Sequence, residues 1–429
     1  MGIIRAFFGL LFIVGVAWIF SKDKKSINWR LVVGGLLLQI AFGLLITQVE
    51  FVSLGFRQVS KFFVYIIDFT NAGTAFLFGD LLNNDKYGFI FALNVLPTII
   101  FFSTLSTGLY YLGVLQKIVY GFAWIMSKTM KLSGAESLSA AGNIFLGQTE
   151  APLLVRPFIP DMTKSELMCL MTGGMATIAG GVLAGYVAFL GGNDTVEQTK
   201  YATFLLSASV MNAPAAIVMS KLLVPEKNYD KLDHKLQISA EKTGVNLIDA
   251  LAKGASDGLK LALNVGAMLL AFIALIAAIN FLLKDMIGEY TGLNQLVVDS
   301  TNGIFDGFSL QYLLGNVFRI FAFMMGVEWG EALQVGSLLG QKTVINEFVA
   351  YLDLATMKSA AMLSDKSLVI ATFSLCGFSN FSSIAIQIGG IGGMAPNRQG
   401  DISKLGMRAL LGASLATMLT GTLAGALLG

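Results

Sequence analysis

The stretch Leu146-Gly-Gln-Thr-Glu-Ala-Pro-Leu-Leu-Val155 places the carboxylate of Glu150 inside an apolar run, two residues before Pro152. An ionised carboxylate at bilayer depth costs about 2.5–3.5 kcal/mol on insertion scales, so it marks a functional position. Proline removes a backbone donor and, together with Gly147, interrupts a helix. The stretch therefore predicts a turn at which polar side chains and free backbone groups face a ligand.

The composition of the whole chain places this turn in a membrane. The 429 residues are 55% hydrophobic and 13% charged, with 47 glycines and a mean hydropathy of +0.72. A soluble domain is roughly 25% charged. The net charge of +2 gives no basis for binding nucleic acid. Cys169 and Cys376 lie in apolar segments and the single His234 lies in a Lys-rich loop, so we predict neither a disulfide nor a metal centre of the usual His and Cys ligands.

Apolar stretches of about 20 residues predict eight transmembrane helices. They cover residues 3–20, 31–48, 88–112, 165–190, 201–223, 261–283, 367–392 and 405–428. The positive-inside rule orients them, because the loops 22–30 and 224–260 are rich in lysine and residues 284–331 are rich in acid. Both termini are therefore predicted to be external. Residues 50–87 are expected to lie on the external surface, and 115–131 on the cytoplasmic surface.

Two further apolar segments, 137–160 and 333–357, are interrupted and have halves too short to span the bilayer. They predict re-entrant helical hairpins, the first entering from the cytoplasm and the second from outside. Leu146-Gly-Gln148 recurs as Leu339-Gly-Gln341, and LLSAS at 205–209 recurs as LLGAS at 410–414. The two units have opposite orientation, which is typical of the inverted repeats of secondary transporters. The predicted fold is an all-α polytopic membrane protein with a site between the repeats.

Glu150 and Glu347 are the acidic residues that lie deepest in apolar sequence. The alternative to a functional role is that each carboxylate only forms a structural ion pair with a nearby cation, Arg156 for Glu150 and Lys342 for Glu347. Two carboxylates in equivalent hairpins favour the functional interpretation.

The polar side chains around these carboxylates indicate the class of solute. Gln148, Thr149 and Glu150 offer donors and acceptors together, which suits a polyhydroxylated or heterocyclic solute better than a simple ion. The later segment at 376–383 adds an amide, hydroxyls and phenyl rings, and this set suits a flat ring attached to a sugar; its members are Phe378, Asn380, Phe381, Ser382 and Ser383.

The motifs GQTEAP, NEFVAY and GFSNFSSIAI resemble the signature stretches of the concentrative nucleoside transporters. Their order and spacing match over essentially the whole chain, at the eight-helix length of bacterial members. The resemblance implies a homotrimer in the bacterial inner membrane, whose transport domains move like elevators past fixed scaffolds. It implies uptake of nucleosides, uridine among them, driven by sodium or, in some members, by protons. It implies no enzyme activity and no cofactor beyond the coupling ion.

Under this resemblance the chain divides into four segments. Residues 1–112 hold the first scaffold helices with the external surface helix, and 113–223 hold the first half of the transport domain. Residues 224–331 hold a cytoplasmic interfacial helix, a scaffold helix and the external segment, and 332–429 hold the second half of the transport domain.

The resemblance also assigns site residues. The nucleoside-binding set is Gln148, Thr149, Glu150, Val182, Glu347, Phe378, Asn380 and Ser383. Within it, the first four lie beside the base, Glu347, Asn380 and Ser383 hold the ribose hydroxyls, and Phe378 packs on the base. The sodium site is formed by Asn143, the Leu146 carbonyl, Thr177 and the Ile178 carbonyl. Oxygen ligands suit a hard cation. An amide at 143 and a hydroxyl at 177 favour sodium over protons.

Three other interpretations follow from the same residues. A proton-coupled nucleoside transporter would use Glu150 or Glu347 as the proton carrier. An intramembrane hydrolase would need a nucleophile–base pair or an HExxH motif, and the sequence shows neither. A channel would need a ring of carboxylates or a basic filter, and the sequence shows neither. Uphill accumulation of solute would exclude a channel or a pure receptor.

Overall fold

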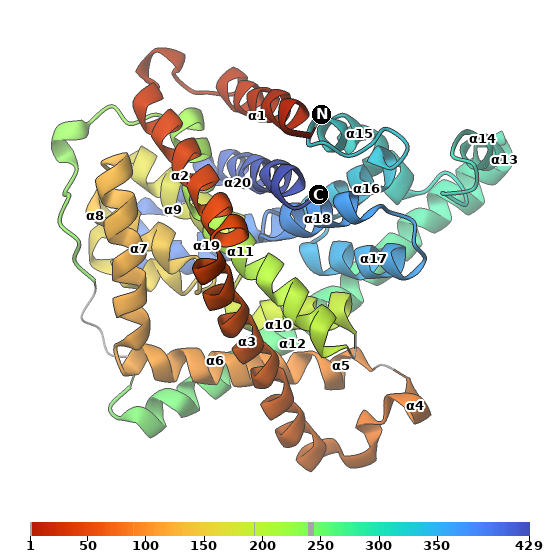
Figure 1. Ribbon diagram of the computed structural model, residues 1–429, viewed down its shortest axis with the longest axis horizontal. Helices are drawn as coiled ribbons and strands as arrows, with labels where there is room; N and C mark the ends of the chain where they lie inside the picture. Colours follow the sequence, from red (N-terminus) through yellow and green to blue (C-terminus); the bar gives the residue numbers. More distant parts are fainter. Residues whose placement is uncertain (1, 89, 193, 239–243) are drawn as a thin grey trace.

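The computed structural model describes residues 2–88, 90–192, 194–238 and 244–429, and every regular element in these ranges is a helix (Figure 1). Residues 239–243 of the predicted cytoplasmic stretch 224–260 lie outside the described residues. The long helices are α1 (Gly2–Ile19), α2 (Trp29–Gln48), α3 (Glu50–Phe78), α6 (Leu96–Tyr111), α7 (Val114–Met130), α11 (Thr195–Leu223), α12 (Leu247–Asn280), α15 (Leu310–Met324) and α20 (Gln399–Leu427).

The remaining helices form hairpins, broken helices and connections. The hairpin elements are α8 (Gly134–Gly142), the 3-10 helix η3 (Ala151–Asp161), α16 (Ala332–Val344) and α17 (Glu347–Ser359). The broken helices are α9 (Lys164–Ala176) with α10 (Gly180–Gly191), and α18 (Asp365–Leu375) with α19 (Phe381–Met394). The connections are η1 (Lys24–Ser26), η2 (Gly79–Leu82), α4 (Asn84–Tyr87), α5 (Phe91–Asn94), η4 (Tyr229–Lys231), the π-helix η5 (Phe281–Gly288), α13 (Glu289–Thr291), α14 (Leu293–Ser300) and η6 (Pro396–Arg398).

Among the described residues, seven helical stretches are long and apolar enough to cross a membrane. Six of them coincide with predicted spans, and the seventh is Glu50–Leu82, which the sequence placed on the external surface. The predicted span at 3–20 corresponds to α1, an apolar helix shorter than these seven stretches. The predicted span at 367–392 is divided into α18 and α19. The exact set of eight spans and two hairpins therefore stays a prediction.

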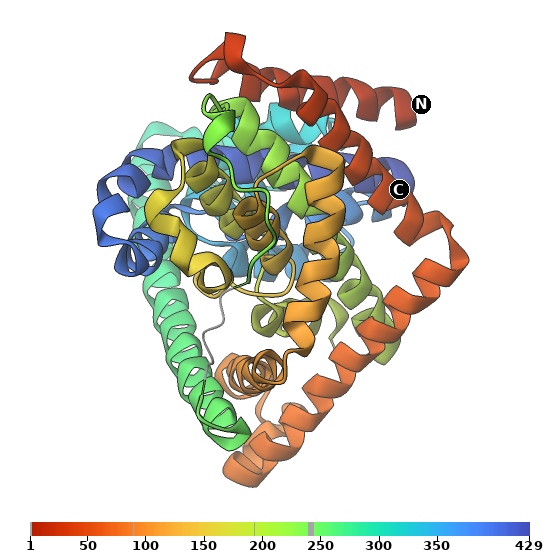
Figure 2. The ribbon, with the colours of Figure 1, turned by 90° about the vertical axis from the view of Figure 1, so that its left-hand side faces the viewer.

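Burial separates the seven stretches into two groups. The apolar windows of Lys164–Gly191, Thr195–Leu223 and Pro396–Leu427 are 100, 89 and 83% buried within the chain. The other four windows are only 17–33% buried. In Figure 2, α3 and α12 lie on opposite sides of the core, and each of them contacts α6. The inner helices thus form a packed core, and the outer helices present apolar faces outward.

Hairpin 1 consists of α8, a turn at 143–150 and η3. A capping box begins α8, in which the Ser133 hydroxyl accepts from the Glu136 backbone and the Glu136 carboxylate accepts from the Ser133 backbone. The returning half is a 3-10 helix because Pro152, Pro157 and Pro160 lack the backbone donors of a regular α-helix. The predicted interruption within 137–160 is thus present, and its first helix begins about one turn earlier than predicted; that the segment is re-entrant stays a prediction.

Hairpin 2 and the two broken helices follow the same plan. In hairpin 2, α16 and α17 are separated only by Ile345 and Asn346. The first broken helix is interrupted at 177–179 and the second at 376–380. Each unit is thus a hairpin, a broken helix and a long helix, α11 in the first and α20 in the second. The order predicted from the short sequence matches is present.

Three predicted boundaries differ from the structure. The helix predicted at 261–283 is the continuation of α12, which begins at Leu247, so no break separates it from the interfacial segment. Ion pairs along the helix surface, such as Lys253–Asp249 at 3.1 Å, support the helix through these polar residues. Pro97 stands in the first turn of α6 rather than inside a helix from 88, because the chain bends at Val95. The external segment contains α15, which the sequence did not predict.

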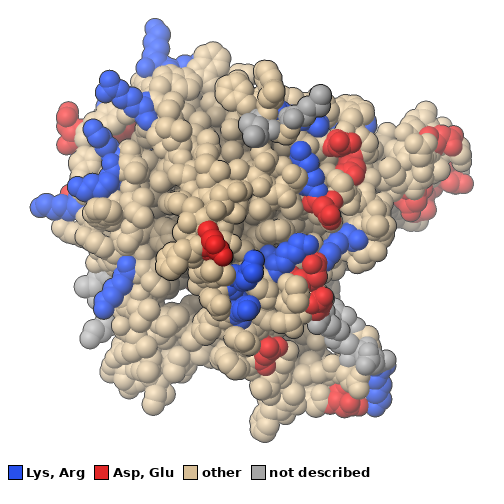
Figure 3. All heavy atoms as spheres, viewed as in Figure 1, with Lys and Arg blue, Asp and Glu red and all other residues tan. Residues whose placement is uncertain are grey.

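Charged side chains are distributed unevenly over the surface. In the view of Figure 3, lysine and arginine gather on the side where α7 and α8 lie, and acidic side chains gather at the far end near α13 and α14. Further basic and acidic side chains lie across the middle of this face, between the two ends. The two ends of this face therefore differ in the sign of their charge.

Candidate functional site

The two broken helices meet at their breaks. The Phe378 N–H donates to the Thr177 carbonyl at 3.3 Å, which joins the two non-helical segments directly. The Asn212 side chain of α11 donates to the Ala176 carbonyl at 2.8 Å and to the Cys376 carbonyl at 2.7 Å. One buried amide thus satisfies carbonyl groups at the ends of both α9 and α18, where helix termini leave them without partners.

A chain of hydrogen bonds connects hairpin 1 to hairpin 2 through this centre. Gln148 Nε2 donates to Ser383 Oγ at 3.0 Å, and the Ser383 N–H donates to Asn380 Oδ1 at 2.9 Å. Asn380 Nδ2 then donates to Glu347 Oε2 at 2.9 Å. All four side chains are at least 93% buried. Four of the eight predicted nucleoside-binding residues, which are up to 235 positions apart in the sequence, are therefore joined in one network.

Two helix N-termini, those of α17 and α19, contribute to this network. Glu347 is the first residue of α17, Asn380 caps α19, and Ser383 is the third residue of α19. Val182 is the third residue of α10, where it is 2% exposed. Helix N-termini carry partial positive charge and unpaired N–H groups, which stabilise a carboxylate and bind polar ligand atoms. The arrangement is suited to a small polar solute with hydrogen-bond acceptors.

The remaining predicted residues lie close to the network. Glu150 Oε2 accepts from the Gly147 N–H at 3.1 Å, so its carboxylate is held by its own hairpin turn. Thr149 is exposed and lies against Gly390 of α19: a Cβ atom added to this glycine would be 3.1 Å from the Thr149 methyl group. Phe378 is half-buried beside the break. Hydrogen bonds join neither Glu150 nor Thr149 to Glu347 in the described residues, so their part in the site stays a prediction.

The four predicted sodium ligands lie where the tip of hairpin 1 meets the first break. The Gly180 N–H donates to the Phe145 carbonyl at 3.3 Å, and this bond docks the tip on the break. Thr177 Oγ1 donates to the Gly173 carbonyl at 2.9 Å. Gly173 also lies against Asn143, because a Cβ atom added to this glycine would be 3.0 Å from Asn143 Nδ2. Leu146 and Ile178 lie on non-helical backbone of the same contact.

Asn143 tests whether these residues fit a cation. It is fully buried, and neither Oδ1 nor Nδ2 has a hydrogen-bond partner among the described residues. A buried amide without partners costs about 1–3 kcal/mol. An oxygen-binding cation would satisfy Oδ1, and the carboxyl-terminal ends of α8 and α9, which carry partial negative charge, meet here. The residues present therefore fit sodium.

The structure corrects one structural alternative. The Lys342 ammonium is not the partner of Glu347, because it donates to the Ser374 carbonyl at 2.8 Å and to Thr417 Oγ1 at 2.9 Å. Lys342 ends α16 and Glu347 begins α17, and the break between them directs the two side chains to different neighbours. The pairing of Glu150 with Arg156 stays a hypothesis.

Two residues of the site were not predicted. The Tyr186 hydroxyl of α10 donates to Glu347 Oε1 at 2.9 Å, and its ring stacks on that of Tyr351 with centroids 4.4 Å apart. Gln387 of α19 is fully buried and lies near Gln148, because both side chains contact Gly174. A Cβ atom added to Gly174 would be 2.8 Å from Gln387 Nε2 and 3.0 Å from Gln148 Cβ. Both are polar groups on otherwise apolar helices, and this contrast is the only sequence signal that marks them.

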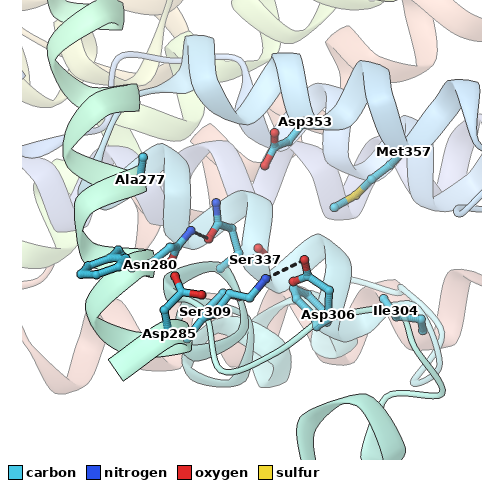
Figure 4. A pocket seen from close by; sticks show the side chains of 13 residues that line it. Ala277, Asn280, Asp285, Ile304, Asp306, Ser309, Ser337, Asp353 and Met357 are labelled. Atoms are coloured by element: carbon cyan, nitrogen blue, oxygen red, sulfur yellow. Dashed lines mark hydrogen bonds and ion pairs between the residues drawn. The ribbon is translucent and has the colours of Figure 1, made fainter. Parts of the chain in front are cut away.

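A separate polar pocket of about 480 Å³ lies behind hairpin 2 (Figure 4). Ser337 of α16 and Asp353 and Met357 of α17 face residues of η5 and the loop before α15 across it. Lys284 pairs with Asp306 there at 2.7 Å. None of the predicted site residues lines this pocket. It marks the boundary between hairpin 2 and the external segment.

Three family models match the chain in succession. Residues 8–81 match the Na+ dependent nucleoside transporter N-terminus, residues 92–193 match a model described as nucleoside recognition, and residues 204–425 match the Na+ dependent nucleoside transporter C-terminus. The chain belongs to the Na+ dependent nucleoside transporter family.

The relatives agree with this membership. An uncharacterized transporter of Bacillus subtilis, YutK, is 43% identical, and the match covers 99% of both chains. Human sodium/nucleoside cotransporter 1 is 37% identical over 98% of this chain, which spans 63% of the human protein.

The solved structures agree in fold. CNTnw in an inward-facing substrate-bound state is 40% identical, with a TM-score of 0.88 over 100% of this chain and 98% of that chain. A CNTnw variant in an outward-facing state is 39% identical, with the same TM-score and coverage.

Proposed function

We propose that this protein imports nucleosides by sodium symport, with uridine among its substrates, and that it catalyses no reaction. The observation that carries the proposal is the hydrogen-bond network from Gln148 through Ser383 and Asn380 to Glu347. Its donors and acceptors come from both repeats, so a solute bound there contacts both hairpins at once. A ribose offers vicinal hydroxyls that both donate and accept, and Glu347 and Asn380 provide matching groups.

Sodium coupling follows from the contact between hairpin 1 and the first break. Asn143 and Thr177 would hold the ion together with the carbonyls of Leu146 and Ile178, at a point where Asn143 has no other partner among the described residues. Gln148 follows Leu146 by two positions. An ion that fixes the backbone at Leu146 therefore also fixes Gln148, which lies at the base end of the solute site. The two ligands thus favour the same conformation, and each should tighten the other by the same factor.

The division into inner and outer helices supports an elevator movement. The first broken helix, α11 and α20 form the buried core, and the hairpins dock on it. The outer helix α6 meets α10 through glycine, because a Cβ at Gly180 would lie only 2.2 Å from the Phe102 ring. A smooth contact of this kind suits sliding. The apolar outer faces suit lipid and two further copies in a homotrimer of the bacterial inner membrane, with both termini external.

Equilibrium binding of uridine tests the coupling. The purified protein should bind uridine at least tenfold more tightly in NaCl than in an equal concentration of choline chloride, and uridine should tighten sodium binding by that same factor. Equal uridine affinity in the two salts would contradict sodium coupling. A response to pH alone, without a response to sodium, would favour the proton-coupled alternative.

A cross-link across the pocket of Figure 4 tests the movement. Cysteines replacing Asp306 of the external segment and Met357 of α17 face the same pocket, and bridging them with a bismaleimide should stop uptake. The control pair replaces Lys284 and Asp306, which contact each other within the external segment. That bridge should leave uptake unchanged. Full uptake with the Asp306–Met357 bridge would contradict movement of hairpin 2 relative to this segment.

A further inference from the structure

Lys342 is a buried cation whose place in the fold has no explanation in packing alone. It lies in the last turn of α16 and is 2% exposed. Its ammonium donates to the Ser374 carbonyl of α18 and to the Thr417 hydroxyl of α20. Within the described residues no carboxylate lies within ion-pair distance of it. A buried charge without a counter-ion is costly, so other groups must stabilise it.

Helix ends supply that stabilisation. Ser374 is the second-last residue of α18, and its carbonyl is one of those that a helix leaves without partners at its carboxyl end. The ammonium also lies near the carboxyl end of its own helix, α16. Two helix ends with partial negative charge therefore face the Lys342 ammonium. Thr417 adds a hydroxyl oxygen whose own proton goes to the Ser414 carbonyl at 3.0 Å.

The first repeat shows the same construction around its predicted ion site. There the carboxyl ends of α8 and α9 meet, and these helices correspond to α16 and α18. The match of LLSAS with LLGAS places Asn212 of α11 in register with Thr417 of α20. Asn212 bonds the carbonyl at the end of α9, and Lys342 bonds both Thr417 and a carbonyl near the end of α18. In the second repeat the Lys342 ammonium therefore lies between the carboxyl ends of α16 and α18, the helices that correspond to α8 and α9.

We propose that Lys342 is a positioning residue whose tethered ammonium does for hairpin 2 what bound sodium does for hairpin 1. It docks α16 on α18 and α20, and thereby fixes Glu347, which begins the returning helix five positions later. The inference rests on the proposed sodium symport. It implies that the second repeat needs no coupling ion, because its cation belongs to the chain.

The test replaces Lys342 and measures how uridine uptake depends on sodium in proteoliposomes. The wild-type protein should show a Hill coefficient for sodium near one. In Lys342→Ala the oxygen-lined space is open to a second sodium ion, so the Hill coefficient should rise toward two and the KM for uridine should rise about tenfold. Lys342→Arg keeps the charge and should retain a Hill coefficient near one. A Hill coefficient near one together with an unchanged uridine KM in Lys342→Ala would overturn the proposal.

Hydrogen exchange separates this proposal from the proposed function. In Lys342→Ala without sodium or uridine, the amides of α17 should exchange at least tenfold faster, while those of α8 keep their wild-type rates. A Lys221→Ala variant is the matched control, because Lys221 is also buried but bonds Glu136 of hairpin 1. It should loosen α8 and leave α17 unchanged. If wild-type uptake proves independent of sodium, the proposed function fails while this exchange result still decides the docking role; unchanged exchange in α17 would refute that role.

Discussion

Tyr186→Phe removes one oxygen atom and tests whether Glu347 must be held in place to bind the solute. The Tyr186 hydroxyl is fully buried and donates to Glu347 Oε1 at 2.9 Å, while Asn380 holds Oε2. A hydrogen bond to a charged group contributes about 1.5–3 kcal/mol. The lower end applies because Asn380 still holds the other oxygen, and about 1.4 kcal/mol corresponds to a tenfold change in affinity. We therefore expect the KM for uridine to rise about tenfold.

Tyr351→Phe is the matched control. Tyr351 is equally buried and stacks on Tyr186, but its hydroxyl donates to the Thr372 carbonyl at 2.7 Å and does not contact Glu347. It removes the same atom from the same cluster and should leave the uridine KM within about twofold of wild type. The assay is initial uptake of radiolabelled uridine at saturating sodium, with 3′-deoxyuridine as a competitor. Wild-type protein should prefer uridine, and Tyr186→Phe should reduce that preference. Equal KM values for the two variants would refute the role of Tyr186 through Glu347.

Two other substitutions are expected to change the thermal stability in opposite directions. Asn143→Leu removes two buried polar atoms without partners among the described residues, so the sodium-free protein should unfold at a higher temperature, while sodium no longer raises that temperature; a sodium-induced rise of wild-type size would contradict the ion site. Lys221→Met leaves the buried Glu136 carboxylate without its cation and should cost about 3–5 kcal/mol of stability. Adding Glu136→Gln should restore most of the lost melting temperature, and a double variant no more stable than the single one would show that the pair is not the cause.

The two interrupted segments were predictable because their signals are local. Pro152 beside Glu150 and the acidic stretch at Glu347 mark interrupted apolar segments within a few residues. The turn chemistry of proline and the cost of a carboxylate in hydrocarbon act wherever the chain goes. These signals therefore needed no knowledge of the partner elements.

The contacts of Tyr186 and Lys342 were not predictable because they are long-range. Tyr186 bonds a carboxylate 161 positions away, and in sequence it is one aromatic residue in an apolar helix. Lys342 suggested a pair with the nearby Glu347, but the break after α16 turns it toward α18 and α20. The sequence predicted an interfacial helix before residue 260 and a separate span at 261–283, and it did not show that the two form the single helix α12.

Uridine accumulation in proteoliposomes tests the central claim most directly. The protein is reconstituted, and radiolabelled uridine is followed under an inward sodium gradient, an inward proton gradient or neither. The account predicts accumulation above the external concentration with the sodium gradient alone. Accumulation with the proton gradient and none with sodium would contradict the assignment of Asn143 and Thr177 as ion ligands, and simple equilibration under every gradient would contradict coupled transport itself.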